Sequence, residues 1–203
     1  MKLRVGSKVD RSSPYLFYAG QLSLVQPRNS RFAEFLPEMS FEQERHKPPL
    51  PLDRSRELVI ACAPLRSNVN LSHIIRLAGC AGIDRVICCG NAKVIDKIAR
   101  DGADTVQFDV HRTLPPVLKR LKAEGYEIVG LEQTSSAESL YDFHFKRRTA
   151  LVVGNERLGL TEEELVEADR TVEIPVYGLP YAYNVHTAVA MAVYEYCRQF
   201  PRG

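Results

Sequence analysis

The chain has 203 residues, and 27 Lys and Arg against 25 Asp and Glu give it a formal net charge of +2. This near-balance excludes a strongly basic protein that coats nucleic acid, although a local basic patch suffices for nucleic-acid binding. Apolar residues make up 45% of the chain, enough for one globular domain and an appendage. No apolar run approaches the roughly 18 residues of a membrane span, and the N-terminus lacks a secretory signal pattern. We therefore expect no membrane contact.

Residues 1–55 differ from the rest of the chain. They carry nine Lys or Arg and six Asp or Glu, whereas the remainder carries 18 and 19. The apolar residues 15–18 and the alternating run 21–25 argue against a purely disordered tail. Prolines near residues 48–51 favour an extended connector. We expect an N-terminal extension over residues 1–55 and a separate domain over residues 56–203.

The five cysteines indicate a reducing environment. They are Cys62, Cys80, Cys88, Cys89 and Cys197. Their number is odd and they form no Cys-x-x-Cys pair, which disfavours both a disulfide framework and a zinc site. We therefore expect a cytoplasmic protein with free thiols and no metal.

From residue 56 onward, apolar runs alternate with amphipathic stretches. The expected strands cover residues 58–63, 85–89, 105–110, 126–131, 149–153 and 172–174. The expected helices cover residues 70–81, 94–100 and 184–199, and two more begin at Thr113 and Thr161. Thr161 to Glu164 forms a capping box. This rhythm predicts an α/β fold, with a mostly parallel sheet and helices on both of its faces.

The last predicted helix has little polar face. Its residues from Val185 to Tyr194 are mostly apolar, and its first carboxylate is Glu195. A helix that is apolar nearly all round is buried on more than one side. We expect this helix to form a subunit interface or to pack unusually deeply.

Three polar segments lie beyond the carboxyl ends of predicted strands, where open α/β sheets bind their ligands. They cover residues 70–76, 154–160 and 174–185. No dinucleotide-binding, P-loop, zinc-protease or α/β-hydrolase motif is present in the sequence. Those enzyme classes are therefore not supported.

Each polar residue in these segments also has a purely structural interpretation. Asn70 could cap a helix, Arg76 could form a surface salt bridge, and Glu156 could cap the helix that follows it. The glycines at 154, 159 and 178 could be ordinary turn residues. Taken singly, none of these residues identifies a function.

Together, the order and spacing of the segments resemble the SpoU/TrmH family of RNA ribose 2′-O-methyltransferases. The family's first motif is Asn-x-Gly-x-x-x-Arg, and its second is an apolar strand running into Gly-x-Glu-x-x-Gly-Leu. Its third is Ile-Pro followed by Ser-x-Asn-Val and a final helix that ends near Tyr-Glu. In this sequence the matching residues are 70–76, 154–160 and 174–195.

The resemblance implies a trefoil-knotted methyltransferase fold, S-adenosylmethionine as cofactor, and a homodimer with the last helix at the interface. The reaction would be methyl transfer to a ribose 2′-hydroxyl of tRNA or rRNA. The polar site residues would be Asn70, Arg76, Glu156 and Asn184. The cofactor would contact Leu131, Gly154, Ile174 and Ala182.

Arg76 is the residue expected to act in the chemistry. A guanidinium stays protonated in proteins, so Arg76 is a poor general base. We expect it to bind an RNA phosphate and to orient or acidify the ribose hydroxyl. Asn70, Glu156 and Asn184 would position the ribose and the methionine end of the cofactor.

The sequence departs from the family pattern at four positions. Ser72 replaces the glycine of the first motif, which predicts a loop with less backbone freedom. Ala182 replaces the serine of the third motif, so only a backbone contact is expected there. His73 and His186 stand where small residues are usual. We interpret both histidines as packing or helix-surface residues, with catalysis as the alternative.

RNA binding requires positive charge and stacking surfaces. The candidate RNA-binding cations are Arg4, Lys8, Arg11, Arg28, Arg31, Lys146, Arg147 and Arg148, with a solvated face as the alternative. Tyr177, Tyr181 and Tyr183 could stack on a base or pack in the core. The extension would be an RNA-binding arm or a structural brace.

Two other functions stay open. The chain could be a catalytically silent RNA-binding protein on the same fold, although Arg76, Glu156 and Asn184 argue against this. It could also be an RNA base methyltransferase, although the spacing of Asn70 and Arg76 favours ribose.

Overall fold

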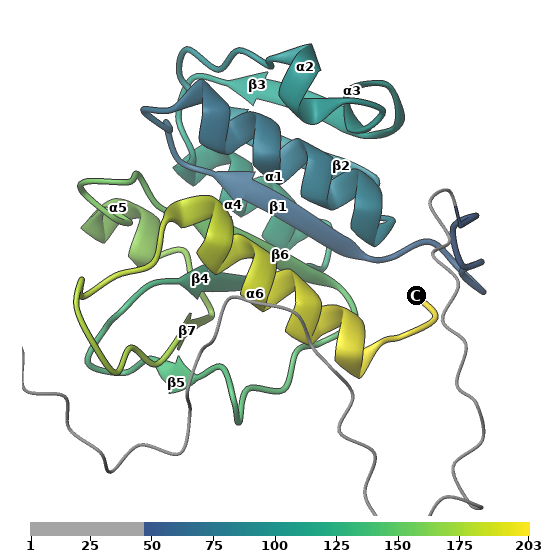
Figure 1. Cartoon of the computed structure of the whole chain (residues 1–203). Coiled ribbons are helices and arrows are strands. Elements are labelled where there is room, and N and C mark those ends of the chain that lie inside the picture. Colours follow the sequence, from purple (N-terminus) through teal and green to yellow (C-terminus); the bar gives the residue numbers. More distant parts are fainter. Residues whose placement is uncertain (1–46) are drawn as a thin grey trace, which may run out of the picture. The chain divides into compact units, whose positions relative to one another are not determined.

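The computed structural model describes residues 47–203 (Figure 1). The chain divides into two units, Met1–Pro48 and Pro49–Gly203, and the second contains every helix and strand named below. Five of the candidate RNA-binding residues lie outside the described residues, namely Arg4, Lys8, Arg11, Arg28 and Arg31. Whether the extension is an arm or a brace therefore stays a prediction.

The second unit is built on a seven-stranded sheet in which every neighbouring pair is parallel. The strands are β1 Leu58–Cys62, β2 Arg85–Cys89, β3 Gln107–His111, β4 Glu127–Leu131, β5 Glu138–Ser139, β6 Thr149–Val153 and β7 Arg170–Glu173. Their order across the sheet is β3-β2-β1-β6-β4-β7-β5. The predicted parallel α/β fold is confirmed. The sequence analysis missed β5, whose two residues are too few to produce a periodic pattern.

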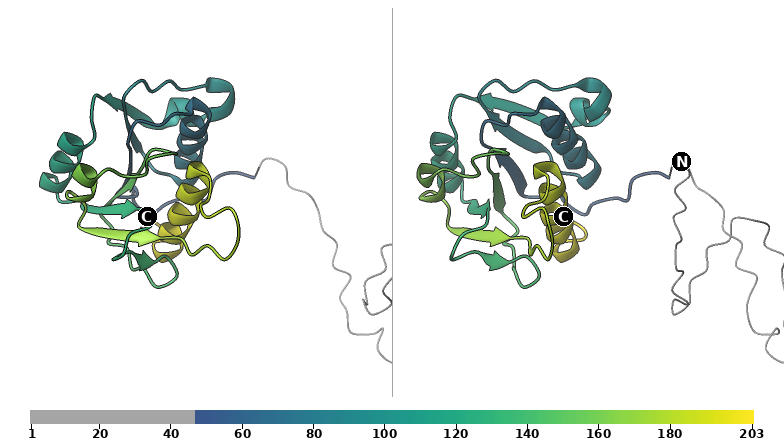
Figure 2. Two further views of the ribbon diagram at one scale, coloured as in Figure 1. Left: turned by 90° about the vertical axis from the view of Figure 1, so that its left-hand side faces the viewer. Right: turned by 60° about the vertical axis from the view of Figure 1, so that its left-hand side comes forward.

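Helices cover both faces of the sheet. They are α1 Asn68–Ala81, α2 Asp96–Ala99, α3 Gly102–Thr105, α4 Pro115–Ala123, α5 Glu162–Leu165 and α6 Val185–Gln199. Figure 2 shows α1 and α6 on one face and α4 and α5 on the other. The helix expected over residues 94–100 ends one residue early, because Arg100 takes a positive φ of 51° and breaks the turn.

Side-chain alternation along the strands produces two cores. Leu58, Ile60 and Cys62 of β1 belong to the core that includes α1 and α6. Val59 and Ala61 belong to the core that includes α4. All five residues of β1 are buried, as expected for a parallel strand covered on both faces.

The first motif lies inside α1 and not in a loop. Ser67 is the N-cap of this helix, and its hydroxyl accepts a hydrogen bond of 3.2 Å from the backbone nitrogen of Asn70. The interpretation of Asn70 as an N-cap was therefore wrong, because the helix begins one turn earlier than its apolar stripe.

The expectation that Ser72 stiffens a loop was also wrong. The residue is fully buried in α1. Its hydroxyl donates to the carbonyl oxygen of Asn68 at 2.7 Å and accepts from the backbone nitrogen of Ile95 at 2.8 Å. Ser72 thus ties the segment after β2 to α1, a connection that glycine lacks.

Candidate active site at the carboxyl ends of the strands

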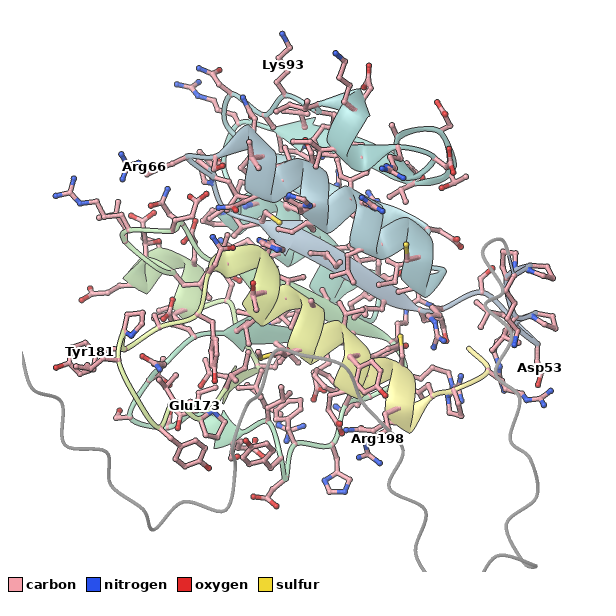
Figure 3. The ribbon with its side chains drawn as sticks, viewed as in Figure 1. Asp53, Arg66, Lys93, Glu173, Tyr181 and Arg198 are labelled. Carbon is pink, nitrogen blue, oxygen red and sulfur yellow. The ribbon has the colours of Figure 1, made fainter. Side chains whose placement is uncertain are left out.

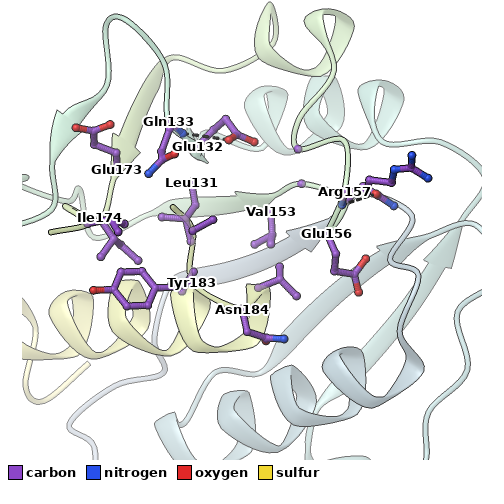
Figure 4. Close-up of a pocket in the computed structure, with 17 residues that line it drawn as sticks. Leu131, Glu132, Gln133, Val153, Glu156, Arg157, Glu173, Ile174, Tyr183 and Asn184 are labelled. Carbon is purple, nitrogen blue, oxygen red and sulfur yellow. Dashed lines mark hydrogen bonds between the residues drawn. The ribbon is translucent and has the colours of Figure 1, made fainter. Parts of the chain in front are cut away.

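A cavity of about 400 Å³ lies beyond the carboxyl ends of β4, β6 and β7, beside the start of α6 (Figure 4). The predicted cofactor residues Leu131, Gly154, Ile174 and Ala182 all line it. Of the predicted polar residues, Glu156 and Asn184 line it as well. Residues 131–133, 153–159 and 173–188, which follow three different strands, thus meet at one place, as the position of the strand ends predicted, whereas no residue of the first motif lines the cavity.

The second motif forms a closed loop after β6. The backbone nitrogen of Asn155 donates to the Gly159 oxygen at 3.0 Å, and the Gly159 nitrogen donates back at 2.9 Å. A Cβ atom on Gly154 would lie 2.4 Å from the carbonyl carbon of Gly159 and 2.6 Å from the backbone nitrogen of Leu160. Gly159 has a φ of +67°. Both motif glycines are therefore required by backbone geometry and are not ordinary turn residues.

Glu156 caps α1, so the interpretation that it caps the following helix was wrong. Its carboxylate accepts hydrogen bonds from the backbone nitrogens of Arg66 at 2.7 Å and Ser67 at 3.0 Å. It also accepts from the side-chain amide of Asn70 at 3.0 Å. Partial burial raises the pKa of Glu156, but the hydrogen bonds from Arg66, Asn70 and Ser67 outweigh it and leave the pKa below its ordinary value.

A chain of hydrogen bonds joins the first and third motifs to Glu156. The ring nitrogen Nδ1 of His186 lies 2.6 Å from the Oδ1 atom of Asn184, which also accepts from the backbone nitrogen of His186. Asn184 Nδ2 donates to the Oδ1 atom of Asn70 at 3.3 Å. Because Asn70 in turn donates to Glu156, every donor in the chain points towards the carboxylate. The predicted polar residues Asn70, Glu156 and Asn184 form one connected unit.

Arg76 lies apart from this unit. It is exposed on α1, does not line the cavity, and has no side-chain partner among residues 47–203. Six residues along a helix correspond to about 9 Å of rise and a rotation to another face. The structural alternative of a surface salt bridge is therefore also unsupported within the described residues.

Three acidic side chains line the cavity, of which the sequence analysis identified only Glu156. Glu132 follows β4 and accepts from the backbone nitrogens of Leu160 at 2.8 Å and Gln133 at 3.1 Å. Glu173 lies at the end of β7. Their positions at strand ends would have been a usable signal. A cavity with three carboxylates and a single cation, Arg157, favours a positively charged ligand.

The two unusual histidines lie against each other. His73 of α1 and His186 of α6 stack with ring centroids 4.8 Å apart and an interplanar angle of 24°. Burial and the charge of His73 lower the pKa of His186. This contact agrees with the packing interpretation and fixes the ring that begins the hydrogen-bond chain.

Lowering the pH from 7.5 to 5.5 should destabilise the wild type more than a His186→Gln variant. The folded state lowers the pKa of His186, so the unfolded state binds more protons near its ordinary value of about 6.5. The stability that the neutral ring provides is therefore lost as the pH falls through the folded value. Urea midpoints at both pH values measure this, with exposed His144→Gln as the control. An equal loss in wild type and His186→Gln would contradict it.

The predicted basic cluster Lys146, Arg147 and Arg148 precedes β6, whereas the cavity follows it. Five strand residues correspond to roughly 16 Å. Lys146 pairs with Glu127 at 3.0 Å and Arg148 with Glu57 at 3.2 Å. The guanidinium of Arg147 lies 4.7 Å from the centre of the Phe200 ring. A role for this cluster in RNA binding stays a prediction.

The tyrosines of the third motif are at the surface. Tyr177 and Tyr181 are 84% and 78% exposed, and Tyr183 is 42% exposed. Core packing was therefore the wrong alternative for them, and base stacking stays a prediction. Figure 3 shows Tyr181 pointing outward from its loop.

Neither a metal cluster nor a membrane helix is found in the part of the chain that the structure describes. No group of three or more His, Cys, Asp or Glu there could hold a metal ion. No helix there has the length and apolar character needed to cross a bilayer.

Similar proteins carry the same domain. In Escherichia coli (strain K12), the tRNA (guanosine(18)-2'-O)-methyltransferase is 29% identical over 149 residues, 72% of this chain and 65% of that protein. The 23S rRNA (guanosine-2'-O-)-methyltransferase RlmB of Acinetobacter baylyi is 31% identical over 153 residues, 72% of this chain and 62% of that protein. The chain thus spans slightly less than two thirds of these relatives.

A solved structure and a family model complete the comparison. The A. aeolicus TrmH/SpoU tRNA modifying enzyme superposes with a TM-score of 0.69 at 25% identity, covering 74% of this chain and 78% of that chain. The model of the SpoU rRNA Methylase family matches residues 57–194. The predicted resemblance is confirmed, and the chain belongs to the SpoU rRNA Methylase family.

Proposed function

We propose that this protein transfers a methyl group from S-adenosylmethionine to a ribose 2′-hydroxyl of tRNA or rRNA. The observation that carries the proposal is the cavity lined by the second and third motif segments, with Asn70 of the first motif joined by hydrogen bonds to Glu156 and Asn184 at its margin. The names of the E. coli and A. baylyi relatives support ribose methylation of tRNA or rRNA. The domain of residues 56–203 would carry the activity, with residues 1–55 as an arm or brace.

The cavity fits the proposed cofactor in charge and in lining. When bound, S-adenosylmethionine supplies an electrophilic methyl on a positively charged sulfur. Glu132, Glu156 and Glu173 would favour that charge. Leu131, Gly154, Ile174 and Ala182 would form the contact surface, and Asn184 would orient the end of the cofactor nearest α6. The SpoU methyltransferase AviRb from Streptomyces viridochromogenes, solved in complex with the cofactor AdoMet, shares the fold. The implied trefoil knot stays a prediction.

The chain's own residues would supply alignment and proton removal. Asn70 is held by its hydrogen bond to Glu156 and Asn184 by its hydrogen bond to Asn70, so both would position the ribose without reorganising. Arg76 would bind an RNA phosphate and acidify the 2′-hydroxyl through its positive charge. Since Arg76 lies outside the cavity of its own chain, bound RNA or a second copy must bring it to the reacting atoms.

A homodimer through α6 would supply that second copy. One side of α6 is buried and consists of Val189, Ala192, Val193 and Tyr196. Tyr194 lies on another side of the helix and is 74% exposed. An open apolar side on a helix this apolar suits a second copy of the same chain. A cytoplasmic setting would agree with the five free cysteines.

Transfer of labelled methyl from S-adenosylmethionine to tRNA and rRNA tests the function. We expect label at one ribose 2′-oxygen, mapped by nuclease digestion and mass spectrometry, and no label with Asn184→Ala. Label on a base would show that the protein methylates a base and not a ribose. RNA binding without any methyl transfer would support the alternative of a catalytically silent RNA-binding protein.

A further inference from the structure

Four exposed cations follow four neighbouring strands, one after each. Arg112 follows β3, Lys93 follows β2, Arg66 follows β1 and Arg157 lies in the loop after β6. The strands are adjacent in that order and parallel. All four residues therefore stand at the same edge of the sheet. With neighbouring strands about 4.8 Å apart, the row has a length of roughly 14 Å.

We call these four residues the cation row, and their side chains have no partner within the described part of the chain. Among residues 47–203, none of the four takes part in an ion pair or a side-chain hydrogen bond. Cations near the opposite edge are paired with carboxylates: Arg85 with Asp109 at 2.9 Å, and Arg170 with Glu138 at 2.7 Å. Among residues 47–203, four of the eight exposed cations for which no side-chain partner is seen thus lie on the edge that carries the cavity, and the other four, Arg54, Arg76, Lys97 and Arg100, lie elsewhere.

Hydrogen bonds fix the backbone of three of the four residues in the cation row. The backbone nitrogen of Arg66 donates to Glu156 at 2.7 Å. The nitrogen of Lys93 donates to the Oδ1 atom of Asn68 at 3.1 Å, and that of Arg157 to the Oδ1 atom of Asn155 at 2.9 Å. Three of the four cations are therefore anchored to the two loops and the helix that build the site. Figure 3 shows Arg66 and Lys93 extending away from the body.

The row ends at the cavity. Arg157 lines one end of it, and its guanidinium points away from the interior in Figure 4. Inside, the carboxylates of Glu132, Glu156 and Glu173 repel phosphate groups. A polyanion is thus attracted along the edge but excluded from the interior. Only a neutral part of it, such as a ribose with its base turned inward, is favoured to enter.

We propose that Arg112, Lys93, Arg66 and Arg157 form a phosphate track that holds one strand of the RNA substrate as it approaches the cavity. The proposal rests on the proposed function for the identity of the polyanion. It assigns the main RNA contact to the edge of the sheet that carries the cavity and not to the cluster Lys146 to Arg148, whose cations are already engaged.

A quadruple variant of the full chain tests the track: Arg66→Gln, Lys93→Gln, Arg112→Gln and Arg157→Gln. We expect its affinity for unfractionated tRNA to fall at least about tenfold. The plot of log affinity against log salt should become less steep by about 3, since each single-strand phosphate contact contributes roughly 0.7. A triple variant that keeps Arg157, with Arg66→Gln, Lys93→Gln and Arg112→Gln, should bind S-adenosylmethionine with unchanged affinity by calorimetry, because none of these three residues lines the cavity.

The matched control removes four cations that lie away from this edge: Lys122→Gln, Arg148→Gln, Arg198→Gln and Arg202→Gln. Each is paired with a carboxylate in the structure, and the net charge change is the same. Equal weakening of tRNA binding in both variants, or none in the first, would overturn the track. Equally tight binding of wild type to poly-glutamate and tRNA would overturn RNA as the partner. If the wild type binds tRNA through the row but transfers no methyl, the proposed function fails and the track stands.

Discussion

Replacing Gly154 by alanine should abolish binding of S-adenosylmethionine and destabilise the fold by about 1–3 kcal/mol. The added methyl would lie under 3 Å from backbone atoms of Gly159 and Leu160. Backbone cannot rotate away as a flexible side chain can, so the loop of residues 154–160 must open. That loop carries Glu156 and lines the cavity. Both the ligand site and the cap of α1 depend on it.

The control for this prediction is Gly178→Ala, because a Cβ at Gly178 would meet nothing within 4 Å. Calorimetric titration with S-adenosylmethionine measures the affinity, and urea unfolding measures the stability. Circular dichroism shows whether Gly154→Ala still folds. A folded Gly154→Ala protein with wild-type affinity would show that the close approach at this position does not matter.

The Arg76→Ala variant should keep its affinity for S-adenosylmethionine and lose at least about 10²-fold in turnover. The residue lies outside the cavity, so cofactor binding does not depend on it. In the proposed mechanism its charge would act only when RNA is in place, where it would acidify the 2′-hydroxyl and stabilise the oxyanion that develops. Single-turnover methyl transfer at saturating RNA measures the effect. Exposed Arg54→Ala is the control, and unchanged turnover in Arg76→Ala would remove Arg76 from the chemistry.

Mixing two inactive variants tells whether Arg76 serves its own chain or a second copy. In a mixed dimer of Arg76→Ala and Glu156→Ala, one cavity keeps its Glu156 and faces a partner that keeps its Arg76. If Arg76 acts across the interface, a statistical mixture should recover about a quarter of the wild-type activity. If Arg76 acts within its own chain, no activity returns.

The strands and the site segments could be predicted because they depend on local patterns. Continuous apolar runs identified β1, β2, β4 and β6, and the capping box at Thr161 identified the start of α5. The resemblance to the family's motifs predicted that Gly154, Glu156 and Asn184 belong to one site, and all three line the cavity. Each of these signals lies within a few residues of sequence.

The rest could not be predicted because it depends on contacts across the fold. Glu156 caps a helix that begins nearly 90 residues before it, so no local pattern reveals its partner. His73 and His186 stack only because α1 and α6 pack side by side on the same face. The position of Arg76 outside the cavity follows from its rotation around α1, which motif spacing alone does not show.

The hydrogen bonds in the chain from His186 through Asn184 and Asn70 to Glu156 can be donated in only one direction. A carboxylate can only accept, so each amide before it must present its NH₂ group forward and its oxygen backward. The ionised side chain of the second motif thereby sets the orientation of three others, drawn from the first and third motifs. A glutamine at position 156 would have nearly the same shape, yet it would place an NH₂ group against the backbone nitrogen of Arg66 or Ser67. In this chain, glutamate at position 156 is thus required because both of its oxygens accept, and not because of its size.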